Sequence, residues 1–389
     1  MVDAATVGPG RGVLTVDADG HVMEPPSMWD EYLDPEYKGR GIRIAHTRKH
    51  GHEYLVFDDK PAPYPPAGLL GVLGGLGMDF RDLYTPGKVT FEESFPPAGW
   101  DPHERLTVMD SEHIDVSVLY PTMGLFWEGW MGDDRDLLAA YCRAYNDWVW
   151  DFCATDARRL IPAGHVSLRN LDAAVAEVHR LAKRGFRTIF IAPDVIDGHR
   201  FSEPMFDPFW RTCEEAELPV GLHVVARMVR DHAVPDMFDG LNLPFHVSMT
   251  FPSDVMYGFA AAMFEGLFER FPRLKMVLLE AGGGWVPHFL DRMDVKWEKL
   301  AHVDTTLTMK PSEYFERQVW VSVDPDEKTL STTVSQIGAG KLVWASDYPH
   351  ADGELGVVEE VLEAVEDLTP DDQRLILGGN VASLYGIER

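Results

Sequence analysis

Short runs of apolar and β-branched residues alternate with amphipathic helical stretches along most of the chain. Eight of these runs are predicted to be strands, because they have strand length and are rich in Val, Ile, Leu or Phe. They cover residues 13–19, 115–120, 160–167, 186–192, 219–225, 274–280, 318–323 and 341–347. Strands that alternate with helices pair in parallel, and eight such units close into a (β/α)8 barrel. Two runs are short, so a seven- or nine-strand arrangement stays open.

The segment 171–185 illustrates the helical half of the repeat. Ala174, Val178 and Leu181 fall on one face of a predicted helix, and polar residues lie off that face. Gly185 is predicted to end the helix, because glycine readily adopts the left-handed conformation that terminates helices.

Two long insertions interrupt the repeat. Residues 22–100 contain a predicted hairpin, IRIAHTRK and EYLVFDD, followed by the Pro/Gly-rich stretch PAPYPPAGLLGVLGGLG. Residues 226–258 form the second insertion. Both follow predicted strands at the end of a barrel where insertions become lids and pocket walls. We therefore expect one domain over residues 1–389, a distorted (β/α)8 TIM barrel with lids after its first and fifth strands.

Composition and charge narrow the function classes. The chain has 35 basic and 63 acidic residues and a formal charge of -28, which would repel nucleic acids and anionic membranes. No apolar stretch approaches the roughly 18 residues of a membrane span, and the first residues lack a secretory signal, so a cytoplasmic location is expected. The three cysteines lack metal or redox spacing and are expected to be reduced core residues.

Ionisable residues are scarce inside the predicted strands, yet six of them fall at or near strand ends. In a barrel these ends form the mouth, where catalytic side chains collect. Buried carboxylates beside imidazoles are costly without a cation, so we predict a metal site there. The predicted ligands are Asp19, His21, His165, His223, Glu280 and Asp347.

Alternation along the first strand supports this site. With a period of two, Thr15, Asp17, Asp19 and His21 would all point into the barrel. The alternative for this segment is a polar turn with a surface histidine. His165 either binds a metal or hydrogen-bonds a ligand residue.

For several other residues the sequence leaves open whether they belong to the site or have only a structural role. Glu280 either faces the mouth or caps local amides. His350, three residues after Asp347, is either an acid/base or second partner of the site or a loop surface residue. Tyr120 and Trp127 belong to an aromatic group after the second strand that either walls an apolar substrate pocket or packs under a lid. The run DPDEK at 324–328 is expected to be a solvated helix face.

Other catalytic signatures are absent from the sequence. It contains no GxSxG elbow, no phosphate-binding GK[ST] loop and no GxGxxG between a strand and a helix. Serine hydrolase, NTPase and Rossmann dehydrogenase functions therefore lack support.

The chain resembles the amidohydrolase superfamily, in the branch of aminocarboxymuconate-semialdehyde decarboxylase-like proteins. The resemblance rests on VDADGHVMEP, RLTVMDSEHIDVSVLYPT, LPVGLHV, FPRLKMVLLEAGGGWVPHFLDRMD, WASDYPHADG and GGNVASLYGI, which follow one another along nearly the whole chain. It implies a distorted barrel with a metal at the mouth and an even-numbered homo-oligomer. Asp19 and His21 would take the places of the family's HxH histidines, His223 that of the strand-five ligand and Asp347 that of the strand-eight carboxylate.

The departures from the family suggest a different chemistry. These decarboxylases usually carry a histidine where this chain has Glu280 and Ala281, and Asp19 replaces another histidine. With His165, three carboxylates and three histidines exceed what one zinc needs and favour iron or manganese, with two ions. In this respect the chain is similar to diiron diterpenoid hydroxylases of the superfamily.

The leading hypothesis is therefore a non-haem diiron monooxygenase that uses O2 and an electron donor. It would hydroxylate an apolar polycyclic terpenoid acid or its CoA thioester, received by a basic patch such as Arg227 and Arg230. The alternative is a metal-dependent hydrolase or decarboxylase of a small carboxylated substrate, in which zinc or manganese lowers the pKa of a bound water to about 7. A non-enzymatic binding barrel would leave the buried carboxylates unexplained.

Overall fold

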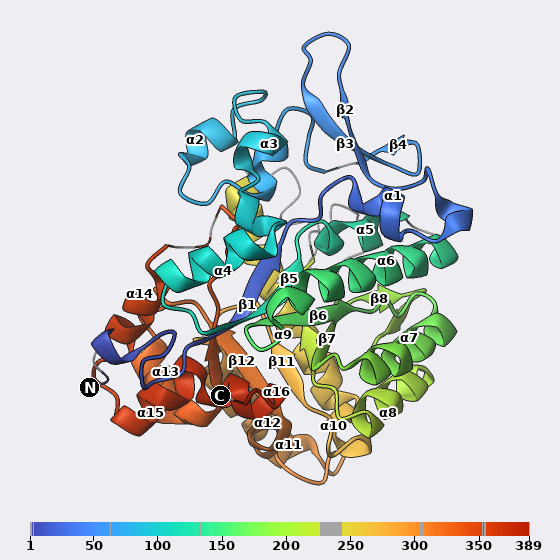
Figure 1. The fold of residues 1–389 in the computed structure, drawn as a ribbon. Helices are drawn as coiled ribbons and strands as arrows, with labels where there is room; N and C mark the ends of the chain where they lie inside the picture. Colours follow the sequence, from blue (N-terminus) through green and yellow to red (C-terminus); the bar gives the residue numbers. More distant parts are fainter. Residues whose placement is uncertain are drawn as a thin grey trace.

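The computed structural model describes residues 2 and 4–388, except for 63, 132–133, 226–242, 304–305, 352 and 354. Its main feature is one eight-stranded sheet in which neighbouring strands are parallel (Figure 1). In sheet order the strands are β1 (Val16–Val22), β5 (Val116–Pro121), β6 (Leu160–His165), β7 (Thr188–Ile191), β10 (Val220–Leu222), β11 (Met276–Leu278), β12 (Val319–Val323) and β13 (Leu342–Trp344).

Backbone hydrogen bonds join the first strand of the sheet to the segment that follows the last. The N–H of Asp347 donates to the carbonyl of Asp19 at 3.0 Å, and the N–H of His21 donates to the carbonyl of Tyr348 at 2.7 Å. These contacts complete the nearly closed barrel. The predicted distorted (β/α)8 fold is confirmed, and each of the eight predicted runs overlaps one strand, although β1 and β5 extend beyond their runs.

Helices surround the sheet (Figure 1). The larger ones are α4 (Pro102–Ser111), α5 (Gly124–Met131), α6 (Arg135–Cys153), α7 (Leu171–Arg184), α8 (Asp207–Glu215), α9 (Leu243–Phe264), α11 (Val286–Leu300), α12 (Pro311–Gln318), α13 (Leu330–Ile337) and α14 (Val357–Ala364). The shorter ones near the C-terminal half are α10 (Leu267–Arg270), α15 (Pro370–Arg374) and α16 (Asn380–Tyr385). Because helices cover the outside and side chains fill the inside, every residue of β1, β5, β6, β7, β10, β11 and β13 is buried.

Helix α7 agrees with its sequence pattern. Ala174, Val178 and Leu181 are buried on its inner face. Gly185 follows with φ 102, in the left-handed region, and its N–H bonds back to carbonyls of the last turn. The three cysteines are free and buried, as expected.

The first insertion packs over one end of the barrel, at the top of Figure 1. It contains α1 (Met28–Tyr32), β2 (Arg43–His46), β3 (Glu53–Phe57), β4 (Lys60–Pro61), α2 (Phe80–Leu83) and α3 (Phe91–Ser94). Strands β2 and β3 are antiparallel, which confirms the predicted hairpin. A backbone bridge between Gly75 and His350 joins the insertion to the loop after β13. Its function as a lid stays a prediction.

The second insertion is described only in part. Residues 226–242, which include Arg227 and Arg230, lie outside the described residues, so the predicted basic patch has no structural account. The remainder belongs to helix α9. A short hairpin of β8 (Val195–Ile196) and β9 (His199–Arg200) follows β7.

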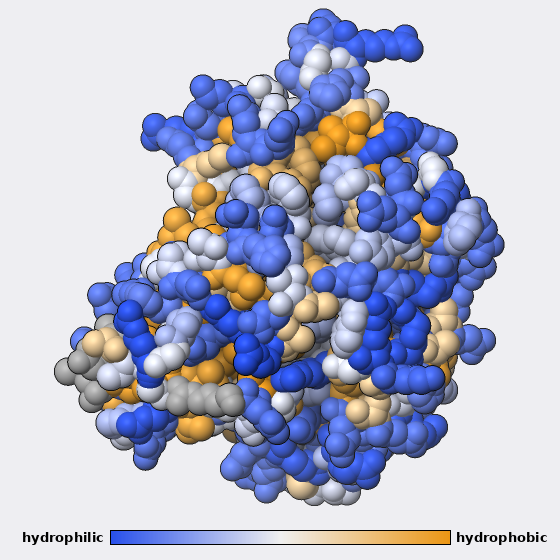
Figure 2. Space-filling model, viewed as in Figure 1, coloured by the Kyte–Doolittle hydropathy of each residue, from blue (hydrophilic) through white to orange (hydrophobic). Residues whose placement is uncertain are grey.

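Polar residues cover most of the face seen in Figure 2, and smaller hydrophobic areas lie between the insertion and the barrel. None of the helices in the described ranges is long and apolar enough to cross a membrane.

Candidate metal centre

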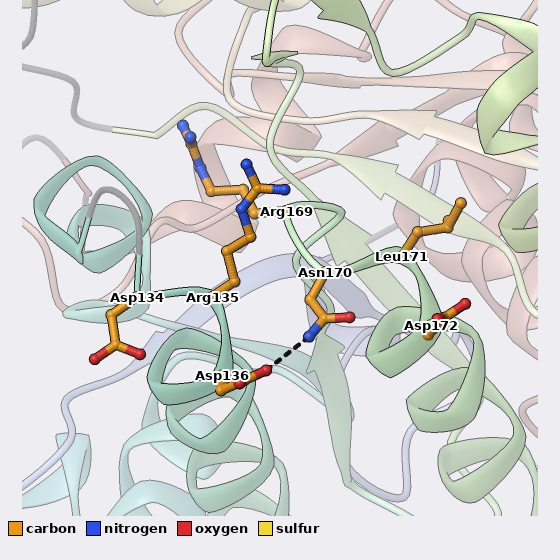
Figure 3. A pocket seen from close by; sticks show the side chains of 7 residues that line it. All are labelled: Asp134, Arg135, Asp136, Arg169, Asn170, Leu171 and Asp172. Atoms are coloured by element: carbon orange, nitrogen blue, oxygen red, sulfur yellow. Dashed lines mark hydrogen bonds between the residues drawn. The ribbon is translucent and has the colours of Figure 1, made fainter.

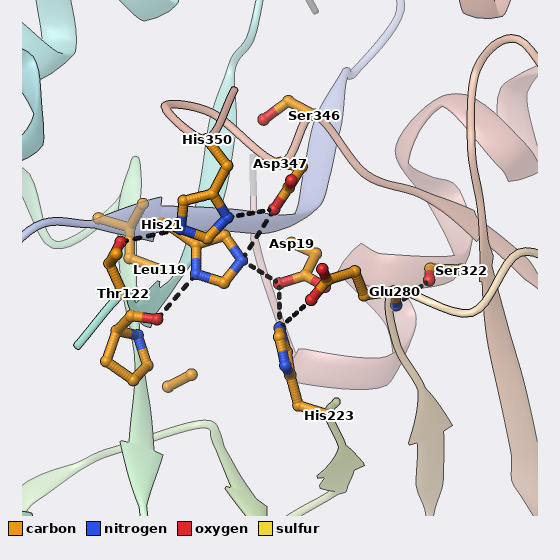
Figure 4. A network of polar contacts seen from close by, with 12 residues as sticks. Asp19, His21, Leu119, Thr122, His223, Glu280, Ser322, Ser346, Asp347 and His350 are labelled. Carbon is orange, nitrogen blue, oxygen red and sulfur yellow. Dashed lines mark hydrogen bonds and ion pairs between the residues drawn. The ribbon is translucent and has the colours of Figure 1, made fainter. Parts of the chain in front are cut away.

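Five of the six predicted ligands gather at the carboxyl ends of the strands (Figure 4). The Nε2 atom of His21 lies 3.5 Å from Oδ1 of Asp19 and 3.1 Å from Oδ1 of Asp347. The Nε2 atom of His223 lies 3.5 Å from Oδ1 of Asp19 and 3.6 Å from Oε2 of Glu280. One ligand atom from each of Asp19, His21 and His223 lies within 4.8 Å of the other two, which is close enough for one ion to contact all three.

The tautomers of both histidines suit a cation. Nδ1 of His21 lies 2.9 Å from the carbonyl oxygen of Pro121, and Nδ1 of His223 lies 2.7 Å from that of Val224. A carbonyl can only accept, so Nδ1 carries the hydrogen and Nε2 keeps its lone pair. Both Nε2 atoms and Oδ1 of Asp19 are buried and make no hydrogen bond within the part of the chain that the structure describes. Three buried, converging electron-pair donors fit a divalent metal ion.

The charge states agree with this arrangement. Burial alone would raise the pKa of Asp347, but the charge of the adjacent His350, its hydrogen bond to Asp347 and the nearby imidazole of His21 hold it well below its ordinary value. Burial lowers the pKa of His21, and the charge of His350 adds to that effect against the opposing carboxylates. Asp347 is therefore ionised and His21 neutral, the forms that bind metals.

Two of the gathered carboxylates stand on unusual backbone. Glu280 has φ 50 and Asp347 has φ 52, in the left-handed region that non-glycine residues seldom adopt. The N–H of Glu280 is held by Oγ of Ser322 at 3.1 Å. Such strained residues persist where the surroundings fix them and cluster at functional sites.

The turn after Glu280 is held by hydrogen bonds to Glu327, a residue to which the sequence analysis gave no such role. The carboxylate of Glu327 accepts the N–H groups of Gly283 at 2.8 Å and Gly284 at 2.9 Å. A Cβ at Gly284 would lie 2.4 Å from Oγ1 of Thr329, so the turn requires glycine there. Residues 324–328 are solvated as expected, since Asp324, Asp326 and Lys328 are exposed. They form no helix, however, because they lie between β12 and α13, where Glu327 binds this turn.

His350 lies beside the cluster. Its Nδ1 is 2.9 Å from Oδ1 of Asp347, and its ring centroid is 4.1 Å from that of His21. His21, Asp347 and His350 form a second group whose ligand atoms lie within 4.8 Å of one another. His350 is thus a partner of the site in position, and its acid/base function stays a prediction.

His165 is not part of either group. It is fully buried, and its Nε2 lies 2.8 Å from Oε1 of Glu128. Its ring stacks on Phe190 at 4.4 Å and on Trp127 at 5.3 Å. The structure therefore pairs this sixth predicted ligand with a carboxylate that the sequence analysis did not identify.

The two predicted substrate-binding aromatics have different surroundings. The ring of Tyr120 is fully buried and lies 5.3 Å from that of His223, directly beside the cluster. Trp127 is also fully buried, and it packs edge-on against Trp29 at 5.4 Å and Tyr141 at 5.7 Å. Trp127 therefore lies among helices α1, α5 and α6, and contact with substrate stays a prediction for both residues.

Asp17 does not point into the barrel as predicted. The pairing of β1 with β5 shifts register between Asp17 and Gly20, which breaks the alternation. Oδ2 of Asp17 instead accepts the hydroxyls of Ser117 at 2.7 Å and Ser346 at 2.8 Å. Burial raises the pKa of Asp17, and these hydroxyls and the charge of nearby Arg105 oppose the rise.

Several polar residues that hold the site were missed. Glu128 had a signal, because it is the only charged residue of the apolar helix α5. Buried Glu24 follows His21 closely in GHVMEP, but nothing in that pattern showed its partners. Thr122 carried no signal at all.

A separate pocket of about 460 Å³ lies between the N-terminal ends of α6 and α7 (Figure 3). Three of its charged groups are already engaged, since Asn170 donates to Asp136 at 3.0 Å and Arg135 and Arg169 bind the aspartates at 197 and 194. It contains none of the clustered histidines. The residues that line it are Asp134, Arg135, Asp136, Arg169, Asn170, Leu171 and Asp172.

A parallel barrel with carboxylate and imidazole donors at its mouth defines the class of metal-dependent barrel enzymes. The chain belongs to the amidohydrolase family, whose profile matches residues 16–387.

Curated relatives are decarboxylases. The chain is similar to 2-amino-3-carboxymuconate-6-semialdehyde decarboxylase of Dictyostelium discoideum, with 26% identity over 294 residues that cover 74% of this chain and 77% of the relative. It is also similar to gamma-resorcylate decarboxylase of Rhizobium sp. (strain MTP-10005), with 24% identity over 258 residues, 63% of this chain and 76% of the relative.

Solved structures share the fold. An amidohydrolase of Mycobacterium avium subsp. paratuberculosis K-10 has a TM-score of 0.78 and 24% identity, over 96% of this chain and 100% of that chain. The 5-carboxyvanillate decarboxylase of Novosphingobium aromaticivorans DSM 12444, complexed with manganese, has a TM-score of 0.68 and 19% identity, over 99% of both chains.

These comparisons confirm the resemblance to the decarboxylase branch and correct the leading hypothesis. The prediction of a diiron monooxygenase is wrong, because the similar proteins of known activity are decarboxylases. The finer likeness to the diiron hydroxylase of platensimycin and platencin biosynthesis is not shown. Two irons, O2, an electron donor and a CoA-linked substrate have no support either, whereas manganese is bound in solved relatives.

Proposed function

We propose that this protein is a metal-dependent decarboxylase of a small aromatic carboxylate. The observation that carries the proposal is the convergence of Asp19, His21 and His223, whose buried donor atoms lie within 4.8 Å of one another without hydrogen bonds among the described residues. The similarity to decarboxylases of carboxymuconate-semialdehyde and resorcylate supports the reaction type.

Asp19, His21, His223 and Asp347 would hold one divalent cation, manganese or zinc, with Glu280 at its edge. When bound, this cation supplies positive charge that attracts the substrate carboxylate and stabilises negative charge on the reacting ring. The carbonyls of Pro121 and Val224 keep the two imidazoles oriented toward it.

The remaining residues would manage protons and water. Decarboxylation replaces a C–CO2⁻ bond by a C–H bond and releases CO2, so the ring carbon must receive one proton. His350 and Asp347 can hold a proton between Nδ1 and Oδ1, which are 2.9 Å apart. Tyr120 would form part of the floor under the substrate. The residues 22–100 would cover the mouth of a single barrel domain that spans 1–389.

Metal exchange followed by a product assay tests this proposal. The protein is stripped with a chelator, reloaded with manganese, zinc or iron, and incubated with gamma-resorcylate or 5-carboxyvanillate without O2. We expect CO2 release with manganese or zinc and none from the stripped protein. Asp19→Asn serves as a site variant, and His50→Asn, in the distant β2–β3 hairpin, as the matched control. Turnover by the stripped protein, or hydrolysis without CO2, would contradict the proposal.

A further inference from the structure

A second buried polar group lies beside the metal centre and has no part in the mechanism above. His165, Glu128 and Ser167 are 0%, 5% and 8% exposed. Oε1 of Glu128 lies 2.8 Å from Nε2 of His165, and Oε2 accepts the hydroxyl of Ser167 at 2.8 Å. Both carboxylate oxygens are therefore engaged, one of them with the imidazole.

This carboxylate determines the tautomer of His165. Burial would raise the pKa of Glu128, but its hydrogen bonds with His165 and with the Ser167 hydroxyl lower it below its ordinary value. The ionised carboxylate can only accept, so Nε2 of His165 carries the hydrogen. In an imidazole whose single hydrogen lies on Nε2, the opposite nitrogen, Nδ1, is an acceptor.

That opposite nitrogen lacks a partner. Nδ1 of His165 is buried and makes no hydrogen bond in the described ranges. Buried polar atoms in folded proteins are almost always hydrogen-bonded, and exceptions frequently have a functional reason. The ring itself is fixed by stacking between Trp127 and Phe190, so its acceptor points in one direction.

The position of His165 in the barrel places its ring, with the unpaired Nδ1 atom, near the metal centre. His165 is the last residue of β6 and pairs with Phe190 of β7. The ring centroid of Phe190 lies 4.4 Å from that of His165 and 5.8 Å from that of His223, so Phe190 neighbours both the imidazole with the unpaired acceptor and a residue of the metal centre. A flat molecule held at the metal centre by its carboxylate could extend over Phe190 toward His165.

We propose that Nδ1 of His165 accepts a hydrogen bond from a substrate hydroxyl that lies on the ring away from the carboxylate. The proposal rests on the proposed function in one respect only, namely that the carboxylate of the substrate binds at the metal centre. It assigns the Glu128–His165 pair to substrate selection, separate from the metal ligands and from proton transfer.

Binding of matched ligands tests the proposal without turnover. Manganese-loaded protein is titrated calorimetrically with benzoate, 3-hydroxybenzoate and 4-hydroxybenzoate, whose hydroxyls cannot chelate a metal together with the carboxylate. We expect one hydroxylated ligand to bind about 10-fold more tightly than benzoate. His165→Gln, whose amide can still contact Glu128 but offers no acceptor at the Nδ1 position, should abolish this preference with unchanged manganese content. The same ratio in wild type and variant, or no preference in the wild type, would overturn the proposal.

A tautomer measurement gives a result even without ligand. Imidazole ¹⁵N spectra of the wild type should show the hydrogen of His165 on Nε2. Glu128→Gln can donate its amide to Nε2 and should move the hydrogen to Nδ1, which removes the hydroxyl preference while melting temperature and manganese content report an intact fold. Hydrogen on Nδ1 in the wild type would refute the inference. Selective binding without CO2 release would instead count against the proposed function alone.

Discussion

The hydroxyl oxygen of Thr122 lies 2.9 Å from Nε2 of His350, although 228 positions separate the two residues in the sequence. The same hydroxyl donates its hydrogen to the carbonyl of Val22 at 2.9 Å. It must therefore accept from His350, so Nε2 carries a hydrogen and Nδ1 faces Asp347. Thr122, directly after β5, thus orients the imidazole in the loop that follows β13.

Removal of the Thr122 hydroxyl should impair turnover more than metal binding. In Thr122→Val the ring of His350 loses the hydrogen bond that holds its Nε2, and we expect kcat to fall about 10-fold, typical for partners that orient site residues. Thr122→Ser keeps the hydroxyl and should retain most activity. Steady-state kinetics and metal analysis of both variants provide the measurement, and equal kcat values would show that the contact is dispensable.

Loss of a proposed ligand should abolish the stabilisation that metal gives. A cation that binds only the folded protein stabilises it by about 2.7 kcal/mol when its free concentration is about 100-fold above Kd. Manganese should therefore raise the melting temperature of the wild type and leave that of His223→Asn unchanged. His50→Asn should respond like the wild type. A normal manganese response of His223→Asn in thermal melts would remove His223 from the ligand set.

Glu24 should make stability depend on pH. Its carboxylate accepts the N–H groups of Thr122, Met123 and Gly124 at 3.1, 2.9 and 2.9 Å. Burial raises the pKa of Glu24 from 4.5 to about 7, against the opposing effect of these hydrogen bonds. The folded protein thus binds this proton more tightly than the unfolded chain does.

The contribution of Glu24 is consequently full below pH 4.5 and is lost as the pH rises toward about 7. The total change is on the order of 3 kcal/mol. Glu24→Gln should flatten the fall in unfolding free energy across this range, measured by urea denaturation at several pH values. Glu31→Gln, at an exposed position of α1, is the control and should keep the wild-type slope. Parallel slopes for wild type and Glu24→Gln would disprove the assignment.

The end of helix α7 should be sensitive to a side chain. Gly185 has φ 102, so Gly185→Ala forces a Cβ into the left-handed region and should cost about 1 kcal/mol of unfolding free energy. Gly340 has no positive φ and no atom within 4 Å of an added Cβ. Gly340→Ala is therefore expected to change stability little. Denaturant titration of both variants distinguishes the effect of the left-handed conformation at Gly185 from the effect that any Gly→Ala exchange would have.

The barrel could be predicted from the sequence because its strands are almost entirely buried on both faces, so most of them are short, largely apolar runs. The actual direction of the Asp17 side chain could not be predicted, because the register shift in β1 leaves no trace in the residue pattern. Strand-end positions in the sequence identified Asp19, His21, His223 and Asp347, whose side chains the structure brings together. Counting ligands without distances also added His165, whose carboxylate partner lies on a helix 37 positions away, and this surplus led to the wrong diiron hypothesis.

The contact between the first strand of the barrel and the segment after the last strand has a consequence for biosynthesis. Asp19 and Asp347 are linked through their own backbones where the first strand meets the segment after the last. A growing polypeptide on the ribosome therefore carries Asp19 and His21 early but lacks the residues that complete their surroundings until position 347 has been translated. Of the four proposed ligands Asp347 is thus the last to be synthesised, and the complete set exists only when most of the barrel has been translated.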